Sequence, residues 1–278
     1  MHKDSILAII KKDLLEVKGN RAAWVPMLVV PLVFVILIPL AMILVPPQMD
    51  LSSGALALDP DLQRMVENMP PAMKATLSGL DDLQSLIVLM LGYLFAPFFL
   101  IFPLMFSTVI AAESFAGERE RKTIEALLYT PASDRELFVG KLLAALIPAV
   151  AITWIAFVGY TIVVNAASWP LFGRLWFPLP GWYPLMFWVA PALALLGVGA
   201  TVLISARSQT FMGAYQTSAS LVVLVLALVF GQISGVLYFS VGVGLLVGLF
   251  FWVAALVILN FAVHRFNRTV LLMARKGK

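Results

Sequence analysis

Residues 113–141 read ESFAGERERKTIEALLYTPASDRELFVGK, and this stretch decides how the rest of the chain is arranged. It holds eleven charged residues and lies between two long apolar segments that hold none. Unpaired charged side chains are costly in the hydrocarbon core of a bilayer. We therefore expect the flanking segments to cross a membrane and residues 113–141 to lie in water close to its surface.

The composition of the whole chain also indicates a membrane protein. Hydrophobic residues make up 62% of the sequence and charged residues only 12%, with a mean hydropathy of +0.98. Soluble domains carry about 25% charged residues, and a transmembrane helix needs about 20 predominantly apolar ones. The sequence therefore predicts an all-α integral membrane protein, a single transmembrane domain over residues 1–278. Its six predicted spans, which contain no Lys, Arg, Asp or Glu, are 24–45, 83–111, 142–165, 184–205, 216–239 and 241–263.

The distribution of Lys and Arg predicts the orientation of these spans. Sixteen of these residues lie on the side of both termini and of residues 113–141, and three lie on the other side. The positive-inside rule then puts both termini of this multi-pass protein in the cytoplasm. The pI of about 9.4 therefore reflects topology and contact with anionic lipid heads, and it does not indicate nucleic-acid binding.

The connections between spans carry their own patterns. The external loop 46–82 has a net charge of −4 and should cap the outer mouth, while 166–183 is rich in Trp and should anchor at the headgroups. Spans five and six nearly touch, which predicts either a tight turn or a re-entrant segment at 231–240. Helical spacing in the external loop predicts a short amphipathic helix that includes Leu62, Met65, Val66 and Met69.

The sequence predicts an amphipathic interfacial helix over residues 4–20, and this helix should end at Gly19-Asn20, before the first span. The alternative is an ordinary juxtamembrane extension. The predicted apolar face holds Ile6, Leu7, Ile10, Leu14 and Val17, with Lys11 and Lys18 opposite.

Within residues 113–141, the segment 119–129 has the composition of a short helix with an apolar stripe and a charged rim. Thr130-Pro131 should end it, and the capping box of Ser133 and Glu136 should start the third span. Such a helix suits a groove on a partner protein. The alternative is a solvated helical hairpin that packs on the chain's own cytoplasmic face.

The pattern E…GERER-KTIEALLYTP-xSxRE-xxxGK resembles the first cytoplasmic loop of the permease subunits of ABC exporters, the ABC-2 type membrane family. The resemblance implies that 113–141 docks on a separate ATP-binding subunit. It also implies an interfacial helix before the first span, and pairing with a second permease copy or a similar chain among membrane lipids. The ATPase-coupling residues that it implies are Glu118, Arg119, Arg121, Lys122, Ile124, Glu125, Leu127 and Leu128.

The chain itself lacks the residues for ATP binding or catalysis. The nearest approach to a P-loop is 117–123, where Arg121 stands in place of the glycine that must precede the lysine. We therefore expect no catalytic residue, cofactor or metal in this chain, with ATP and Mg²⁺ on the partner ATPase. The chain has no cysteine, and Met65, Met69 and Met73 are a weak basis for a copper site because Pro70-Pro71 interrupts their helix.

The absence of ionisable residues from the predicted spans argues against a proton- or sodium-coupled carrier and against an intramembrane hydrolase. The expected function is a permease subunit of an ATP-driven exporter of hydrophobic or amphipathic cargo, such as a drug, lipid or peptide. Alternatives are a membrane platform or sensor without bulk export, export of an ion or copper-related species, and a channel or membrane enzyme with no ATPase. The resemblance implies that spans two and five line the pathway. Its candidate residues are Phe99, Phe102, Ser107, Gln216, Thr217 and Ser220. Hydrogen bonds between helices would also explain the polar residues, and a lipid-facing stripe would also explain the phenylalanines.

Overall fold

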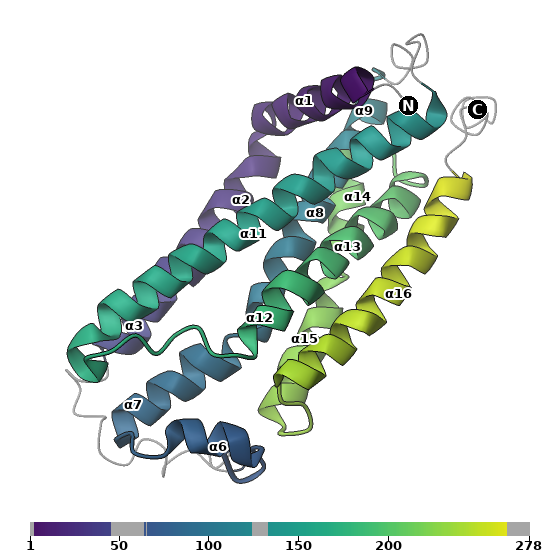
Figure 1. The fold of residues 1–278 in the computed structure, drawn as a ribbon. Coiled ribbons are helices and arrows are strands. Elements are labelled where there is room, and N and C mark those ends of the chain that lie inside the picture. Colours follow the sequence, from purple (N-terminus) through teal and green to yellow (C-terminus); the bar gives the residue numbers. More distant parts are fainter. Residues whose placement is uncertain (1–2, 46–63, 65, 124–132, 266–278) are drawn as a thin grey trace.

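The computed structural model describes residues 3–45, 64, 66–123 and 133–265 (Figure 1). Across these residues the secondary structure is entirely helical, as predicted. Six helices are long and apolar enough to cross a membrane, which confirms the predicted fold class. Their bounds are Arg21–Leu44, Asp82–Glu120, Arg135–Phe172, Trp182–Ser205, Phe211–Ile233 and Val241–Val263.

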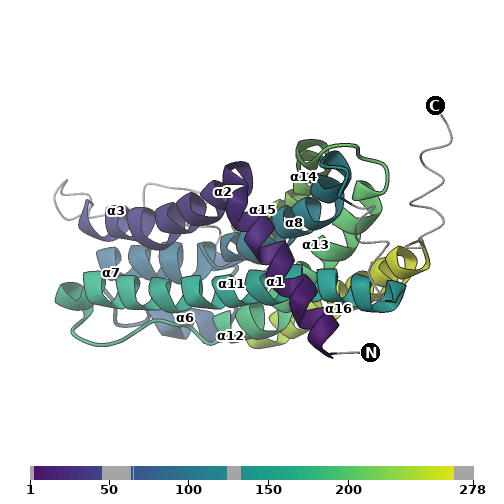
Figure 2. The same ribbon diagram turned by 90° about the horizontal axis from the view of Figure 1, so that it is seen from above.

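The chain begins with α1 (Lys3–Gly19), which crosses α11 (Asp134–Phe172) at an angle (Figures 1 and 2). The predicted break at Gly19-Asn20 is confirmed, because the Asn20 side chain accepts a hydrogen bond from the Ala22 amide and caps the next helix. The first span then consists of α2 (Arg21–Leu32), a π-helical turn η1 (Val33–Leu37) and α3 (Ile38–Leu44).

The second span is irregular and longer than its apolar sequence suggests. It follows α6 (Pro71–Leu77) and starts with a capping box in which the Asp81 side chain accepts from the Gln84 amide. Pro97 begins a 3₁₀ turn where the helix changes its winding, and Pro103 lies in the first turn of the α-helix that follows. Its pieces are α7 (Asp82–Ile87), η3 (Val88–Leu94), η4 (Pro97–Leu100), α8 (Ile101–Ala112), η5 (Glu113–Gly117) and α9 (Glu118–Glu120).

The third span is the single long helix α11. Its predicted capping box is confirmed: Ser133 Oγ accepts from the Glu136 amide at 3.3 Å, and the Ser133 amide donates to Glu136 Oε2 at 2.9 Å. The helix ends at Gly173, whose φ of 61° lies in the left-handed region that glycine favours.

The last three spans are joined by short connections. The fourth is α12 (Trp182–Pro184), η6 (Leu185–Val189) and α13 (Ala190–Ser205). The fifth is broken into α14 (Phe211–Ala219) and α15 (Val222–Ile233), and the sixth is α16 (Val241–Arg265). A short connection at 234–240 joins the last two, with Gly235 at a φ of 72°.

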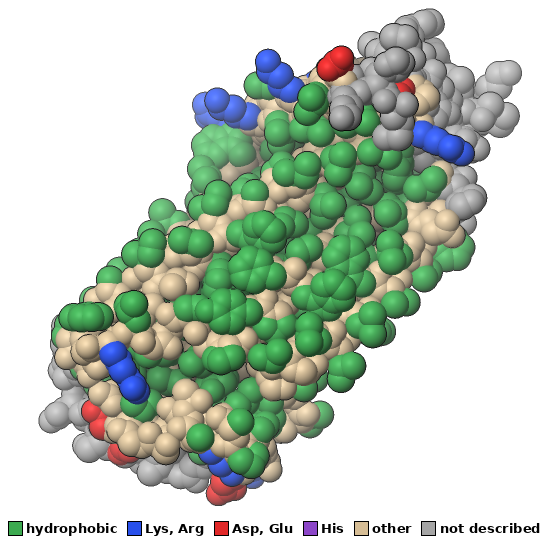
Figure 3. All heavy atoms as spheres, viewed as in Figure 1, with side chains coloured by type: hydrophobic (Ala, Val, Ile, Leu, Met, Phe, Trp, Pro, Cys, Tyr) green, Lys and Arg blue, Asp and Glu red, His purple; other side chains and the backbone are tan. Residues whose placement is uncertain are grey.

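The core lies between α8, α11 and α13 and is rich in aromatic rings. The Phe99 and Trp182 rings pack edge to face with centroids 5.2 Å apart, and Trp182 Nε1 donates to the Gly92 carbonyl at 2.7 Å. The Tyr160 hydroxyl donates to the Leu91 carbonyl at 2.9 Å. Hydrophobic side chains cover the middle of the face in Figure 3, and charged ones gather at its two ends, as expected for a bilayer-spanning bundle.

Candidate functional site

The charged segment and the N-terminal helix meet at one end of the bundle. There, α1 packs against the start of α11 and against η5. Gly140 allows the close approach, because a Cβ on Gly140 would lie 2.9 Å from Ile9 Cγ2. Ile9, Asp13 and Val17, spaced four residues apart on α1, are all buried in this contact. The apolar face predicted for this helix therefore does not pack on the protein as a whole. Val17 faces the protein, whereas Leu7 and Leu14 are exposed.

A buried ionic cluster joins three separate elements at this point. Lys141 Nζ lies 2.7 Å from Glu118 Oε2 and 3.6 Å from Asp13 Oδ2, and it donates to the Ser114 carbonyl at 2.6 Å. The Ser114 hydroxyl donates to Asp13 Oδ2. Asp13 and Glu118 are each 1% exposed and Lys141 is 2% exposed, so these charges are shielded from water. Removing one partner from such a pair leaves an uncompensated buried charge.

Lys12 extends the cluster to the surface of α1. Its ammonium pairs with Glu118 and lies 3.0 Å from Glu16 Oε1. Burial by itself lowers the pKa of Lys12, but the nearby carboxylates, Glu118 first and then Asp13 and Glu16, together outweigh burial and raise that pKa above its ordinary value of 10.5. The carboxylates of Asp13, Glu16 and Glu118 are close enough together to hold a cation, and the two lysine ammonium groups supply that positive charge.

Glu113 forms a second buried ionic contact one turn away. Its fully buried carboxylate pairs with Arg121 and accepts a hydrogen bond of 2.8 Å from Asn20 Nδ2. Gly117 makes room for it, since a Cβ there would lie 3.1 Å from the Glu113 carboxyl carbon. Arg121 also lies 3.3 Å from Glu16 on α1. The π-helical turn η5 thus presents Glu113 to the junction between α1 and the first span.

These contacts change the interpretation of Glu118, which the family resemblance implies is an ATPase-coupling residue. The structure instead buries its carboxylate between Lys12 and Lys141 of the same chain. A charged residue that a sequence pattern places in water can be buried when oppositely charged partners from distant parts of the sequence pair with it. Glu118 therefore supports the junction of α1, the second span and the third span from within.

The predicted helix 119–129 does not begin at Arg119. The helix of the second span continues to Glu120 and ends in a Schellman motif, with the Thr123 amide bonded to the Glu118 carbonyl at 3.0 Å and Lys122 at a φ of 58°. The side chains of Arg121 and Lys122 are exposed at this end. The remaining predicted coupling residues, Ile124, Glu125, Leu127 and Leu128, lie outside the described residues.

Arg119 and Glu120 reach the connection between the fourth and fifth spans. Arg119 Nη1 donates to the carbonyls of Ser205 at 2.8 Å and of Ala206 and Ser208 at 3.1 Å, which caps the end of α13. Glu120 Oε2 accepts from the Phe211 amide at 2.8 Å at the start of α14. A cation at a helix C-terminus and an anion at a helix N-terminus both match the helix dipoles.

The six predicted pathway residues fall into two separate groups. Phe99, Phe102 and Ser107 are fully buried inside this one chain, where they line no surface. Ser107 packs so tightly on α13 that a Cβ on Gly197 would lie 2.3 Å from its hydroxyl oxygen. The other group is exposed on α14 or at its end and consists of Gln216, Thr217 and Ser220.

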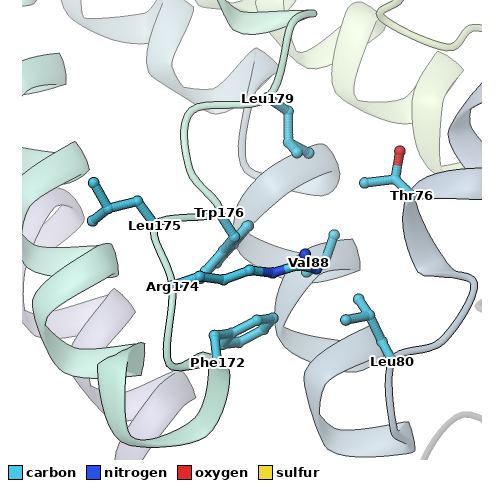
Figure 4. Close-up of a pocket in the computed structure, with 8 residues that line it drawn as sticks. All are labelled: Thr76, Leu80, Val88, Phe172, Arg174, Leu175, Trp176 and Leu179. Carbon is cyan, nitrogen blue, oxygen red and sulfur yellow. The ribbon is translucent and has the colours of Figure 1, made fainter.

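The opposite end of the bundle carries a small cavity of about 170 Å³ between α6 and the loop that follows α11 (Figure 4). Arg174 extends into it beside Phe172 and Trp176, whose rings stack at 5.2 Å. Met69 and Met73 are buried as apolar side chains, and Met65, the third methionine of the possible copper site, lies outside the described residues.

Comparison with known proteins identifies the family. A family described as "ABC-2 family transporter protein" matches residues 7–257, which include all six membrane-length helices except the last turns of the sixth. No curated protein and no solved structure matches the chain. This match is consistent with the six apolar helices and with the charged segment between the second and third spans. The chain belongs to the ABC-2 family and is a multi-pass membrane permease subunit of an ABC transporter.

Proposed function

We propose that this permease works as an exporter, driven by a separate ATPase that docks at the end of the bundle carrying residues 113–141. The Lys and Arg asymmetry supports a cytoplasmic position for that end and for both termini. ATP and Mg²⁺ bind to the partner ATPase, and a second permease copy or a similar chain completes the membrane part. The cargo is amphipathic, because the chain offers apolar helix surfaces and uncharged polar side chains within its spans.

The observation that carries this proposal is the convergence of buried ionic and capping contacts on the charged segment. Lys141, Glu118 and Asp13 join the third span, the second span and α1. Arg119 and Glu120 continue this set of contacts to the ends of the fourth and fifth spans. A force applied to residues 121–133 by a docked protein is therefore transmitted to four spans and to the interfacial helix.

The contacts suit the transmission of force because they are short and shielded from water. Electrostatic interactions are stronger in a low-dielectric interior than at an exposed surface. Glu113, Glu118 and Lys141 have little freedom to reorganise, so the end of the second span and the start of the third move as one body. Closure of the ATPase then shifts this body relative to the rest of the bundle and switches the pathway from inward- to outward-open.

The segment that docks on the ATPase is the one that follows the end of the second span. Ile124, Leu127 and Leu128 form its apolar stripe in the sequence, with Glu125 beside them and the exposed Arg121 and Lys122 at its start. Burying a Leu side chain is worth roughly 1.5–3 kcal/mol. We expect Leu127→Asp to remove that gain and to put an unpaired charge in an apolar groove.

The test is co-purification of the tagged permease with the ATPase expressed beside it, together with ATPase rates in liposomes. Leu127→Asp should insert normally and lose the ATPase, or retain it weakly with hydrolysis uncoupled from transport. Leu175→Asp is the matched control, because Leu175 is exposed at the opposite end of the bundle. If Leu127→Asp assembles and transports like the unmodified protein, residues 124–128 are a solvated hairpin and the docking proposal is wrong.

A further inference from the structure

The exposed surface of the fifth span is polar at residues 216–220, whereas farther along the span it is apolar, with Val223 and Phe230 exposed. Gln216 and Thr217 on α14, and Ser220 just beyond its end, are exposed within a membrane-length helix. The hydroxyls bond to their own backbone, Thr217 to the Gly213 carbonyl at 2.9 Å and Ser220 to the Thr217 carbonyl at 2.7 Å. The Gln216 amide has no partner among the residues that the structure describes. An unpaired amide in hydrocarbon is costly, so this surface faces water or a polar ligand.

A cavity of about 430 Å³ opens beside this polar surface, between the end of α13 and α14. Its apolar wall is Leu203 and Ile204, and its polar wall is Arg207, Ser208 and Thr217. Arg207 comes two residues after the end of α13, which is also the end of the fourth membrane-length helix, so we place it near the lipid headgroups. Its guanidinium is exposed and forms no ion pair or hydrogen bond within the described part of the chain.

This combination of side chains selects a class of ligand. A guanidinium binds phosphate and carboxylate groups through paired hydrogen bonds, and hydroxyl groups can donate to the same oxygens. The apolar wall lies on the membrane side of the guanidinium and suits a hydrocarbon chain. A ligand that satisfies both walls has an anionic head and an apolar tail.

The walls of this cavity are also held by the charged segment. Arg119 donates to the Ser208 carbonyl at 3.1 Å. Ser208 directly follows Arg207 and precedes the start of α14. Glu120 accepts from the Phe211 amide at 2.8 Å. Movement of the end of the second span therefore changes the separation between Arg207 and the polar surface of α14.

We propose that this cavity binds the anionic head of an amphipathic cargo taken from the adjacent leaflet. Arg207 binds the phosphate or carboxylate, and Gln216, Thr217 and Ser220 form the polar surface along which the head moves into the bilayer. This inference rests on the proposed export function, and it adds the charge of the cargo and the residue that selects it.

The experiment uses the full-length permease with its ATPase in phosphatidylcholine nanodiscs and liposomes. The probes are fluorescent phosphatidic acid and the matched phosphatidylcholine. We expect the complex to bind the anionic probe more tightly, and Arg207→Ala to weaken that binding by roughly ten- to a hundredfold, as loss of a charged hydrogen bond does. Arg207→Lys should retain most of the preference. Arg174→Ala is the matched control, because it removes an exposed arginine at the other end of the bundle.

A cargo and a resident structural lipid differ in what ATP does to them. A cargo probe should stimulate ATP hydrolysis and change leaflet when ATP is added, and both effects should be lost in Arg207→Ala. Equal binding of the two probes, or an equal loss in Arg174→Ala, overturns the proposed site. Binding without stimulation or movement identifies a resident lipid and overturns the cargo assignment. Co-purification of the ATPase is scored separately, so a failed export function is distinguished from a failed cargo site.

Discussion

Replacing Lys141 with Met tests whether the buried ionic cluster holds α1 and the two spans together. Met keeps most of the volume of the lysine side chain and removes its charge. The structure gives Lys141 three partners: Glu118 at 2.7 Å, the Ser114 carbonyl at 2.6 Å and Asp13 at 3.6 Å. Breaking a buried pair by removing one partner costs about 3–5 kcal/mol. Lys12 stays within reach of both carboxylates, so we expect a loss near the lower end, about 3 kcal/mol.

The measurement is the free energy of unfolding in mixed micelles, with protease sensitivity of α1 as a second readout. A double variant, Lys141→Met with Glu118→Gln, should cost less than the sum of the two single changes, because no buried carboxylate at position 118 is then left unpaired. Lys18→Met is the control, since Lys18 is an exposed lysine on α1. The reasoning is refuted if Lys141→Met unfolds like the unmodified protein, or if the two single losses simply add.

Three further predictions concern the same end of the molecule and its orientation. Gly140→Val should detach α1, because the added carbon would lie 2.9 Å from Ile9 Cγ2; Ile9→Ala should restore protection of α1 from protease, and failure of that rescue would contradict the close-packing argument. The pKa of Lys12 is raised by folding, so its stabilising contribution is present below about pH 10.5 and is lost as the pH rises through the folded value; Lys12→Gln should therefore flatten the alkaline part of a stability-against-pH curve. Single cysteines introduced at Glu125 and Glu67 should label from the cytoplasmic and external sides respectively, and the reverse pattern would overturn the orientation.

Hydropathy and local capping signals predicted the spans and several of their ends. The capping box of Ser133 and Glu136 and the break at Asn20 depend only on neighbouring residues, so they could be recognised without the fold. The end of the second span could not. Glu113 and Glu118 mark the exit from the bilayer in sequence, yet the helix continues through both of them because Arg121 and Lys141 neutralise their charge.

The role of α1 was visible in the sequence only in part. Ile9, Asp13 and Val17 share one face of the helix, but an aspartate at the centre of a stripe reads as a residue that faces water. Its burial depends on Lys141, whose proximity only the fold reveals. The family resemblance implied that Phe99 and Phe102 line a pathway, but both are fully buried within the chain. Ring contacts with other spans accompany this burial, Phe99 with Tyr160 and Trp182, and Phe102 with Phe34.

The buried ionic cluster also constrains the order in which the protein can be assembled during its synthesis. Lys12 is made first, Glu118 follows after 106 further residues, and Lys141 comes only with the third span. Until that lysine is in place, the partly exposed Lys12 is the one ammonium partner that the described residues offer Asp13 and Glu118, and α1 lacks the surface at Gly140 against which it packs. A nascent chain with only two inserted spans therefore lacks the completed junction, and α1 gains its buried surface on α11 only when the third span is made.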